Sequence, residues 1–437
     1  MLERKITQEL SAWKKRDNHL PLLVSGARQV GKTHSITQFV HKEYTNVISL
    51  NFAQNPQYAS IFSGSLEVDE MLKRISLFVP TVKYVPGETV FFFDEIQESP
   101  HARTALKFFA LDKRFDVIAS GSLLGISYKD ETSLPVGYVD HCHMNSLDFE
   151  EFLWAYGYNE SAISVLKEHL ETITALPSEI HNKMLELLRE YAVLGGMPNV
   201  VQHFLDTHNI NEAIRIQKNI LRDYRADIAK YAEGAEKSKA RACFDSIPRQ
   251  LARDYKKFSY SVVEKKAGGR KYQGSLQWLY DAGIINFCHN LEAIDLPLEG
   301  NVKSDNFKVY TRDTGILLAM LEAGSHRDVL TGNLGIYKGA LYENLAADIF
   351  TKENRALYFY GEGAHREIDF VIRDKGEAVP VEVKSSDNKK AKSLTSLIAQ
   401  GKARRGIKLG TNNLGTTNNI ETIPLYLAPF LLEVRGL

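Results

Sequence analysis

The sequence has little cysteine, no net charge and no long hydrophobic run, and each absence excludes a class of protein. Its 437 residues include 3 cysteines, Cys142, Cys243 and Cys288, without a CxxC pair, so neither a disulfide framework nor a zinc knuckle is expected. The 54 basic and 54 acidic side chains cancel, so no overall charge indicates a nucleic-acid or membrane partner. No run reaches the roughly 20 apolar residues of a membrane helix, and no apolar signal segment opens the chain, which predicts a cytoplasmic protein.

The length and the apolar pattern predict an α/β chain of several domains. From Pro21 to Leu124, short apolar runs alternate with helical stretches, as in a parallel sheet covered by helices. The runs that we expect to be strands are Pro21–Ser25, Val47–Phe52, Thr89–Phe93 and Phe115–Ala119.

Beyond Leu147 the pattern changes to helices, interrupted by a turn at Leu194-Gly-Gly-Met-Pro198. Short helices and a strand follow, and from Gly332 a helix precedes alternating strands. The predicted parts are an AAA+-like ATPase domain (1–155), a helical lid or connector (156–235), a winged-helix-like domain (236–331) and a restriction-endonuclease-like α/β domain (332–437).

A glycine-rich loop after the first expected strand carries the pattern GxxxxGKT. Its backbone can curl around an anion at the start of the following helix. Lys32 is expected to reach the β and γ phosphates of ATP, and the Thr33 hydroxyl is expected to bind Mg²⁺. The candidate nucleotide-binding residues of this segment are Gly26, Ala27, Arg28, Gln29, Val30, Gly31, Lys32, Thr33 and His34.

Two acids end the third expected strand, Phe91-Phe-Phe-Asp94-Glu95. A carboxylate at a strand end suits a hard cation, so Asp94 is expected to hold Mg²⁺. Glu95 is the candidate for the base that orients and deprotonates the attacking water, with a solvated strand-end acid as the alternative. Ser120 or Ser122, at the end of the fourth strand, would sense the γ-phosphate, although Ser122 is equally suited to cap a helix.

These motifs together resemble those of AAA+-type ATPases over residues 1–155. More specifically, Gly26–Thr33, Phe93-Asp-Glu-Ile-Gln97 and Ser120-Gly-Ser122 resemble a bacterial and archaeal family of predicted ATPases with an uncharacterised C-terminal domain. Further segments extend this likeness over nearly the whole chain: Ser146–Phe152, Gly195–Pro198, Tyr224–Ile228 and Leu276–Gly283. The sequence departs from the family at Leu147-Asp148, where a Leu-Ser pair is expected. No arginine finger is assignable; Arg225 is the first candidate, against an ordinary salt bridge on a helix surface.

Residues 258–285 have the order helix, glycine turn, helix and strand, which fits a winged helix-turn-helix. Tyr272, Leu276 and Leu279 would form the buried stripe of the second helix, which Gly283 ends. An excess of positive charge around this unit is suited to DNA phosphates, although such a run is also typical of a solvated face. The basic residues are Lys256, Lys257, Lys265, Lys266, Arg270 and Lys271.

The tail contains two acidic strands in succession, Glu367-Ile-Asp369 and Val381-Glu382-Val-Lys384. The period of two places Glu382 and Lys384 on one face of their strand. If the two strands pair as a hairpin, Asp369 can project beside Glu382. Two carboxylates and a lysine would then make a divalent-metal site of the kind used in phosphodiester hydrolysis.

Upstream, Glu343 lies among small apolar residues of a predicted helix, where a buried carboxylate needs a partner. The order helix-Glu, strand-Asp, strand-Glu-x-Lys resembles the PD-(D/E)xK nuclease superfamily over residues 332–437. By that resemblance Asp369 and Glu382 would bind Mg²⁺, Lys384 would position the nucleophile, and Glu343 would support the metal. The alternatives are surface charges on a hairpin or a nuclease-like fold that only binds.

The leading hypothesis is an ATP-hydrolysing, DNA-associated protein whose AAA+-like module controls a metal-dependent nuclease-like tail. Its cofactors would be ATP and Mg²⁺, and DNA is a better candidate partner than RNA. The alternative is a nucleotide-dependent binding switch whose tail is not catalytic. In a third hypothesis the tail forms the interface of a homo-oligomer.

Overall fold

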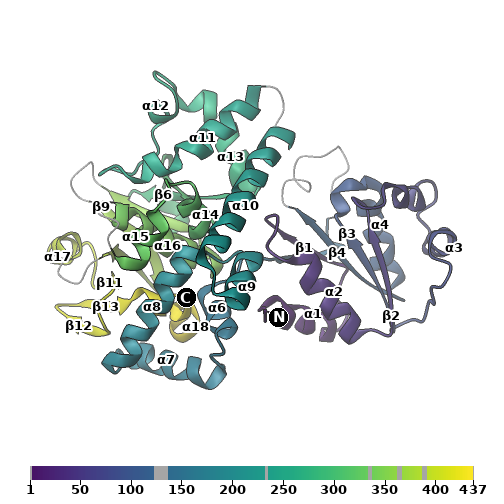
Figure 1. The fold of residues 1–437 in the computed structure, drawn as a ribbon, viewed down its shortest axis with the longest axis horizontal. Coiled ribbons are helices and arrows are strands. Elements are labelled where there is room, and N and C mark those ends of the chain that lie inside the picture. Colours follow the sequence, from purple (N-terminus) through teal and green to yellow (C-terminus); the bar gives the residue numbers. More distant parts are fainter. Residues whose placement is uncertain are drawn as a thin grey trace. The chain divides into compact units, whose positions relative to one another are not determined.

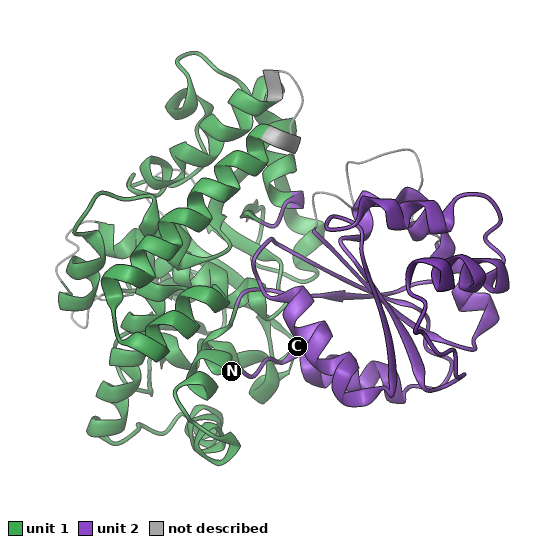
Figure 2. Cartoon of the chain, turned by 45° about the vertical axis from the view of Figure 1, so that its right-hand side comes forward, with its two compact units in different colours: residues 1–2, 147–280, 284–437 green, residues 3–146, 281–283 purple. Residues whose placement is uncertain are grey.

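The chain is described by a computed structural model and divides into two compact units (Figures 1 and 2). The smaller unit is Glu3–Ser146 with 281–283, and the larger consists chiefly of Leu147–Tyr280 and Ile284–Leu437. The division into units falls after residue 146, and the helices and strands of 147–280 and 284–437 belong to one unit. The structure describes residues 2–122, 136–231, 235–332, 337–361, 367–385 and 391–436.

The smaller unit contains a parallel sheet with the strand order β2-β3-β4-β1-β5. All four predicted strands are present. The fifth was not predicted, because its sequence, Asp-His-Cys-His, has no run of β-branched or apolar residues. The strands are β1 (Leu22–Gly26), β2 (Asn46–Asn51), β3 (Thr89–Asp94), β4 (Asp116–Ser122) and β5 (Asp140–His143).

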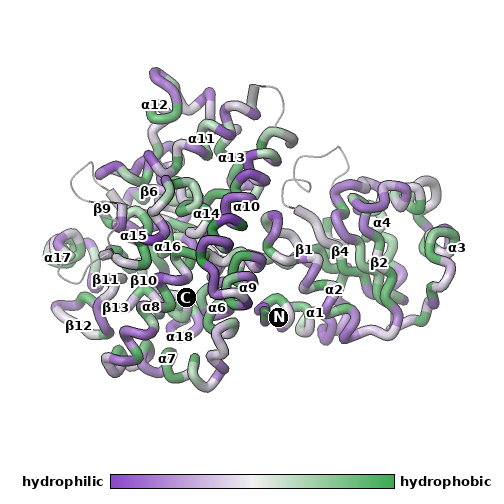
Figure 3. Tube along the Cα trace, viewed as in Figure 1, coloured by the Kyte–Doolittle hydropathy of each residue, from purple (hydrophilic) through white to green (hydrophobic). Residues whose placement is uncertain are grey.

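Both faces of this sheet are apolar and are covered, as the continuous hydrophobic run of β3 indicates. Phe91 and Phe93 pack into one buried cluster, whereas Val90 and Phe92 pack into the other, following the strand period of two. Figure 3 shows hydrophobic residues along these strands. The surrounding helices are α1 (Ile6–Lys15), α2 (Lys32–Glu43), α3 (Val68–Phe78) and α4 (Pro100–Asp112), with 3₁₀ turns η1 (Pro56–Phe62) and η2 (Ile96–Glu98).

The larger unit begins with the predicted run of helices, and the expected glycine turn separates α8 from α9. None of the described helices is both long and apolar enough to cross a membrane. The helices before the first strand are α6 (Phe149–Ala155), α7 (Glu160–Thr172), α8 (Ser178–Leu194), α9 (Pro198–Thr207), α10 (Ile210–Tyr231), α11 (Ala235–Leu251), α12 (Tyr260–Val263) and α13 (Gly269–Asp281). The later helices are α14 (Thr314–Ala319), α15 (Ser325–Thr331), α16 (Tyr337–Lys352), α17 (Lys392–Ala399) and α18 (Leu431–Arg435), with 3₁₀ turns η3 (Leu298–Asn301) and η4 (Leu425–Phe430).

A mixed sheet with the order β12-β13-β11-β10-β9-β8-β6-β7 forms the centre of the larger unit. The antiparallel β6–β7 hairpin, which follows the predicted winged helices, joins the tail because β6 pairs in parallel with β8. The two predicted C-terminal domains therefore share one sheet. Its strands are β6 (Ile285–Leu291), β7 (Val302–Thr311), β8 (Leu357–Gly361), β9 (Glu367–Asp374), β10 (Glu377–Val383), β11 (Gly406–Gly410), β12 (Gly415–Thr417) and β13 (Ile420–Pro424).

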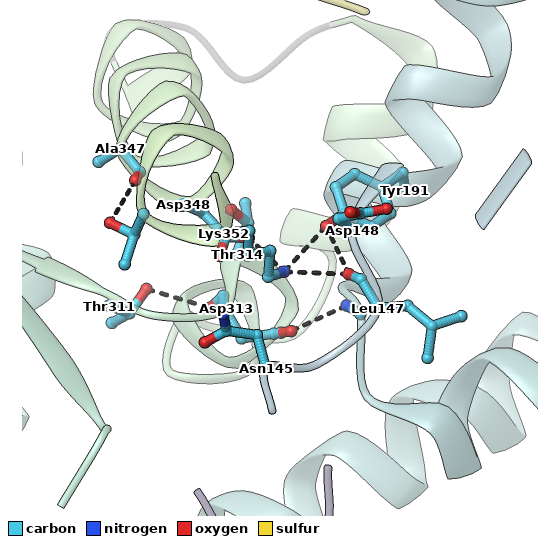
Figure 4. Close-up of polar contacts among 12 residues, drawn as sticks. Asn145, Leu147, Asp148, Tyr191, Thr311, Asp313, Thr314, Ala347, Asp348 and Lys352 are labelled. Carbon is cyan, nitrogen blue, oxygen red and sulfur yellow. Dashed lines mark hydrogen bonds and ion pairs between the residues drawn. The ribbon is translucent and has the colours of Figure 1, made fainter. Parts of the chain in front are cut away.

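A buried polar network surrounds Leu147, the first residue of the long segment 147–280 of the larger unit (Figure 4). The Leu147 N–H donates to the Gly196 carbonyl at 2.7 Å. The Leu147 carbonyl accepts from the Tyr191 hydroxyl at 2.8 Å and from Lys352 Nζ at 3.1 Å. Lys352 also pairs with Asp348 at 3.0 Å. Both polar atoms of the Leu147 backbone are thus satisfied inside the larger unit.

The turn Leu194-Gly-Gly-Met-Pro198 needs its glycines because other backbone approaches it closely. A Cβ on Gly196 would lie 2.1 Å from the Leu147 carbonyl oxygen, and Gly195 has a φ of +66°. The Gly196 N–H donates to Asp313 at 2.8 Å. At the position where the family resemblance led us to expect serine, Asp148 caps α6 by accepting from the Glu151 N–H at 2.8 Å. The aspartate therefore provides the same cap as a serine would.

Candidate functional site

The predicted phosphate loop connects β1 to the first turn of α2. Gly31 is the N-cap of α2 and has a φ of +97°, a left-handed conformation that glycine adopts without strain. Gly26 is needed for a different reason, since a Cβ there would lie 2.2 Å from the Met144 carbonyl oxygen. The loop therefore presents the open N-terminus of a helix, where an anion is stabilised.

Lys32 is buried within this loop and donates to the carbonyl oxygens of Gly26 at 3.0 Å and Ala27 at 2.8 Å. Burial lowers the pKa of Lys32 to about 8, and the nearby Glu95 and Asp94 offset part of this effect. A phosphate would offer the ammonium group stronger acceptors than these two carbonyl groups. The lysine is thus placed to exchange loop carbonyls for phosphate oxygens.

Three neutral side chains converge on Asp94 at the end of β3. The Thr33 hydroxyl donates to its two carboxylate oxygens at 3.0 and 3.2 Å. Asn51, its register partner at the end of β2, donates at 2.7 Å. Ser120, from the end of β4, also donates to Asp94. The loop, two neighbouring strand ends and the acid are thereby brought to one edge of the sheet.

Glu95 follows Asp94 in a left-handed conformation with a φ of +54°. Such a conformation is uncommon for a residue other than glycine. Gln97, which is buried, donates from its amide to the Glu95 carboxylate. Ser122 remains within β4 and its buried hydroxyl has no hydrogen-bond partner among the described residues. Any helix that Ser122 would cap lies outside the described residues.

The remaining loop residues support the loop or face solvent. Gln29 has a φ of +65°, and the Val30 carbonyl accepts from Arg4 Nη1 at 2.9 Å. Arg4 also donates to the Asn145 carbonyl at 2.7 Å, so it links the loop to the segment after β5. Ala27 and Arg28 are half-buried, whereas His34 is exposed on the first turn of α2.

Arg225, the first candidate for an arginine finger, is engaged in an ion pair. Its Nε and Nη2 donate to Asp245 Oδ1 at 3.0 and 2.7 Å, which connects α10 to α11. This contact corresponds to the salt bridge that we considered as the alternative.

The residues at the loop fit a nucleotide with Mg²⁺. Thr33 is exposed and lies against the buried Asp94, so a hydroxyl and a carboxylate are available to the same cation. A bound Mg²⁺ would neutralise charge on the transferred phosphate. Lys32 would orient the phosphates, and the Glu95 carboxylate, held by Gln97, could accept a proton from water.

In the tail, three carboxylates form a cluster, although their identities differ from the predicted set. The structure groups Glu343 from α16 with Glu367 and Asp369 from β9, and oxygens of all three lie within 4.8 Å of one another. Asp369 Oδ2 accepts from the Val383 N–H of β10 at 2.7 Å. Burial and the neighbouring Glu343 raise the pKa of Asp369 to about 7. Such a cluster requires positive charge.

Two lysines provide this charge. Lys308 from β7, which is fully buried, contacts Glu343 at 3.1 Å and also pairs with Glu367. Lys256, from the segment after α11, contacts the other oxygen of Glu343. Burial raises the pKa of Glu343, but the two lysines outweigh it and bring the pKa to about 2. Two of the three carboxylates, Glu343 and Glu367, are therefore already paired with ammonium groups in this arrangement.

Glu382 and Lys384 share a face of β10 and its continuation, as predicted, and pair with each other at 2.5 Å. Strands β9 and β10 do form the expected antiparallel hairpin, and their register pairs Val381 with Phe370. Even so, Glu382 is absent from the carboxylate cluster, in which Glu367 takes its place.

The structure also changes the basic patch proposed for DNA. Lys256 was expected to contact phosphates, but it is half-buried and bound to Glu343, because that carboxylate needs a counterion. Lys271 pairs with Glu264 at 2.7 Å. Lys265, Lys266 and Arg270 are exposed and form no ion pair with any described residue.

Sequence reasoning assigned no role to several residues that prove important: Arg4, Asn51, Gln97, Lys308 and Tyr310. For Lys308 a signal existed, since a lysine stands between apolar residues in Phe307-Lys-Val-Tyr310. A charged residue in a buried strand needs a partner. For Asn51 the signal was its place at the end of a strand, as for Asp94.

Comparisons with known proteins match three segments of the chain. Residues 18–153 match the family model of the AAA domain. Residues 185–327 and 338–428 match two domains of unknown function, DUF8612 and DUF4143. Among proteins with curated functions, none matches this sequence.

Several solved structures show a distant likeness. The Walker-type ATPase PABY2304 of Pyrococcus abyssi is 13% identical with a TM-score of 0.43, covering 73% of this chain and 96% of its own. The Aeropyrum pernix ORC1 protein, solved with DNA, is 11% identical with a TM-score of 0.29, covering 76% and 91%. The Thermotoga maritima RuvB Holliday junction branch migration motor is 12% identical with a TM-score of 0.29, covering 65% and 89%.

The AAA match and the geometry at the loop define the class of this protein. Residues 18–153 contain the loop with Lys32 and Thr33, the acid Asp94 and the serine Ser120, in one parallel sheet. The chain therefore contains a P-loop ATPase domain of the AAA type.

Proposed function

We propose that the chain is an ATP-driven switch that associates with DNA and whose nuclease-like tail binds without cutting. The observation that carries the nucleotide part is the convergence of Thr33, Asn51 and Ser120 on Asp94, beside the buried Lys32. ATP with Mg²⁺ would replace these internal contacts. The exchange would give the bound and free states different hydrogen bonds, which is what a switch requires.

The DNA part rests on charge and on local fold. Helices α11, α12 and α13 precede the β6–β7 hairpin, the order expected of a winged helix. Lys265, Lys266 and Arg270 offer three exposed cations next to α12 and at the start of α13. Since their charges are not neutralised by ion pairs with described residues, they remain available to phosphates. Assembly into a homo-oligomer stays a prediction.

ATP hydrolysis measured with and without duplex DNA tests both parts. Lys32→Ala is expected to abolish hydrolysis, because the loop loses its phosphate-binding cation. Duplex DNA is expected to stimulate ATP hydrolysis by the parent. The triple variant Lys265→Ala, Lys266→Ala and Arg270→Ala is expected to lose this stimulation and to retain basal hydrolysis.

A matched control removes the same charge from the exposed surface of the smaller unit. It is the triple variant Lys15→Ala, Lys42→Ala and Lys83→Ala. DNA stimulation should survive in this control. If both triple variants lose it equally, the effect is one of overall charge and the patch has no special role. If Lys32→Ala hydrolyses ATP at the parent rate, the ATPase proposal fails.

The second candidate function is a metal-dependent nuclease in the tail. Two buried carboxylate oxygens, Glu367 Oε2 and Glu382 Oε2, have no hydrogen-bond partner among the described residues, which favours an additional ligand. Plasmid incubated with Mg²⁺ or Mn²⁺ decides the matter. Cleavage by the parent that is lost in Asp369→Ala would establish the nuclease and overturn the binding-only tail.

A further inference from the structure

The acidic cluster of the tail contains its own cations. Three carboxylates lie close enough to share one ion, and both oxygens of Glu343 are already occupied. Lys256 contacts Oε2, whereas Lys308 and the Tyr310 hydroxyl contact Oε1. The space beside this carboxylate is therefore filled by groups of the chain itself.

Lys308 bridges two members of the cluster in the manner of a bound cation. Its ammonium group pairs with Glu343 from α16 and with Glu367 from β9, and its side chain is 0% exposed. It lies within β7, between Phe307 and Val309, so the backbone is fixed by the β6–β7 ladder. The Lys308 ammonium group is thereby kept out of solvent and against the two carboxylates.

Lys256 is held at the cluster by its neighbours in sequence. The Phe258 N–H donates to the Phe307 carbonyl at 2.8 Å, and the two rings stack with centroids 6.0 Å apart. Phe258 is thereby attached to β7 next to Lys308. This attachment positions the ammonium group of Lys256 against Glu343.

We propose that Lys308 takes the place of a metal ion in this tail, so that the carboxylate cluster is neutralised by lysine and excludes divalent cations. This inference deepens the binding-only function proposed for the tail and rests on it, but it is independent of ATP hydrolysis. It explains how Glu343, Glu367 and Asp369 can lie together inside the protein, because the two lysines offset their negative charge. It also predicts that a cation site appears when the lysine charge is removed.

Titration of the full chain with Mn²⁺, without nucleotide and in a Lys32→Ala background, tests this inference by calorimetry. We expect no Mn²⁺ binding in the parent that depends on Asp369. The Asp369→Asn variant should therefore bind Mn²⁺ to the same extent as the parent. Lys308→Met, which keeps the apolar stem, is expected to gain one Mn²⁺ site at least tenfold tighter than any Mn²⁺ binding measured in the parent. Adding Asp369→Asn to Lys308→Met should remove that site. Lys257→Met, a neighbouring lysine outside the cluster, should gain none.

Two results would overturn the inference. One is Mn²⁺ binding by the parent that Asp369→Asn abolishes. This measurement does not depend on how well Lys308→Met folds. The other is a folded Lys308→Met protein, shown by an intact cooperative thermal transition, that binds Mn²⁺ no better than the parent. Neither result would affect the ATPase proposal, which Lys32→Ala tests separately.

Discussion

Removing the ammonium group of Lys308 should destabilise the larger unit strongly. The side chain is fully buried, lies 3.1 Å from Glu343 and also pairs with Glu367. Burial lowers the pKa of Lys308, but the surrounding carboxylates outweigh it and raise the pKa overall, so the charged form is the stable one. Breaking a buried ion pair from one side costs about 3–5 kcal/mol, because the remaining charge is left without a partner.

A double-mutant cycle separates the ion pair from general damage. Glu367→Gln added to Lys308→Met removes a stranded carboxylate, whereas Glu343 still has Lys256 and Tyr310. The double variant is therefore expected to be less destabilised than the sum of the single variants, with a coupling of about 0.5–3 kcal/mol.

Urea unfolding followed by tryptophan fluorescence provides the measurement. In a Trp13→Phe background, the two remaining tryptophans, Trp154 and Trp278, both belong to the larger unit. The reasoning is refuted if Lys308→Met costs less than about 1 kcal/mol, or if the effects of the two substitutions simply add.

Three further predictions concern the nucleotide site and the network around Leu147. Glu95→Gln should still bind ATP but hydrolyse it about 100- to 10,000-fold more slowly, as single-turnover kinetics would show; an unchanged rate would exclude Glu95 as the base. Burial raises the pKa of Asp348 from 3.8 to about 7, so the folded state holds the extra proton. Stability should therefore fall as the pH rises from about 4 to 7. The free energy of unfolding of Asp348→Asn should lack this pH dependence. If unfolding experiments give the same difference in free energy between parent and variant at every pH, the prediction is wrong. Gly196→Ala should cost about 1–3 kcal/mol because its Cβ would meet the Leu147 carbonyl; Gly274→Ala, on open helix surface, is the control and should cost nothing.

Much of the nucleotide site could be predicted because its residues are close in sequence and follow the ends of strands. Gly31, Lys32 and Thr33 belong to one loop, and Asp94 ends an apolar run. The parallel sheet then brings strand ends to the same edge. The roles of Gln97 and Arg4 could not be assigned in this way, since each acts through a hydrogen bond to another residue that only the folded chain brings into reach.

The tail illustrates the opposite case. The period of two predicted correctly that Glu382 and Lys384 share a face, and β9 and β10 pair as expected. However, the shared face of Glu382 and Lys384 did not determine which carboxylates lie together in the cluster. Glu367 lies two residues before Asp369 on the same face of β9, and the sheet presents this pair, without Glu382, to Glu343.

The sequence by itself determined the elements whose signals are local: the phosphate loop, the apolar strands, the run of helices and the glycine turn. Only the tertiary structure decided which charges neutralise one another. Lys256 and Glu343 are separated by 87 residues, and Lys308 and Glu343 by 35. The reason is physical, because the cost of burying a charge depends on every element packed around it. A lysine whose sequence context suits DNA can therefore be required inside the protein instead.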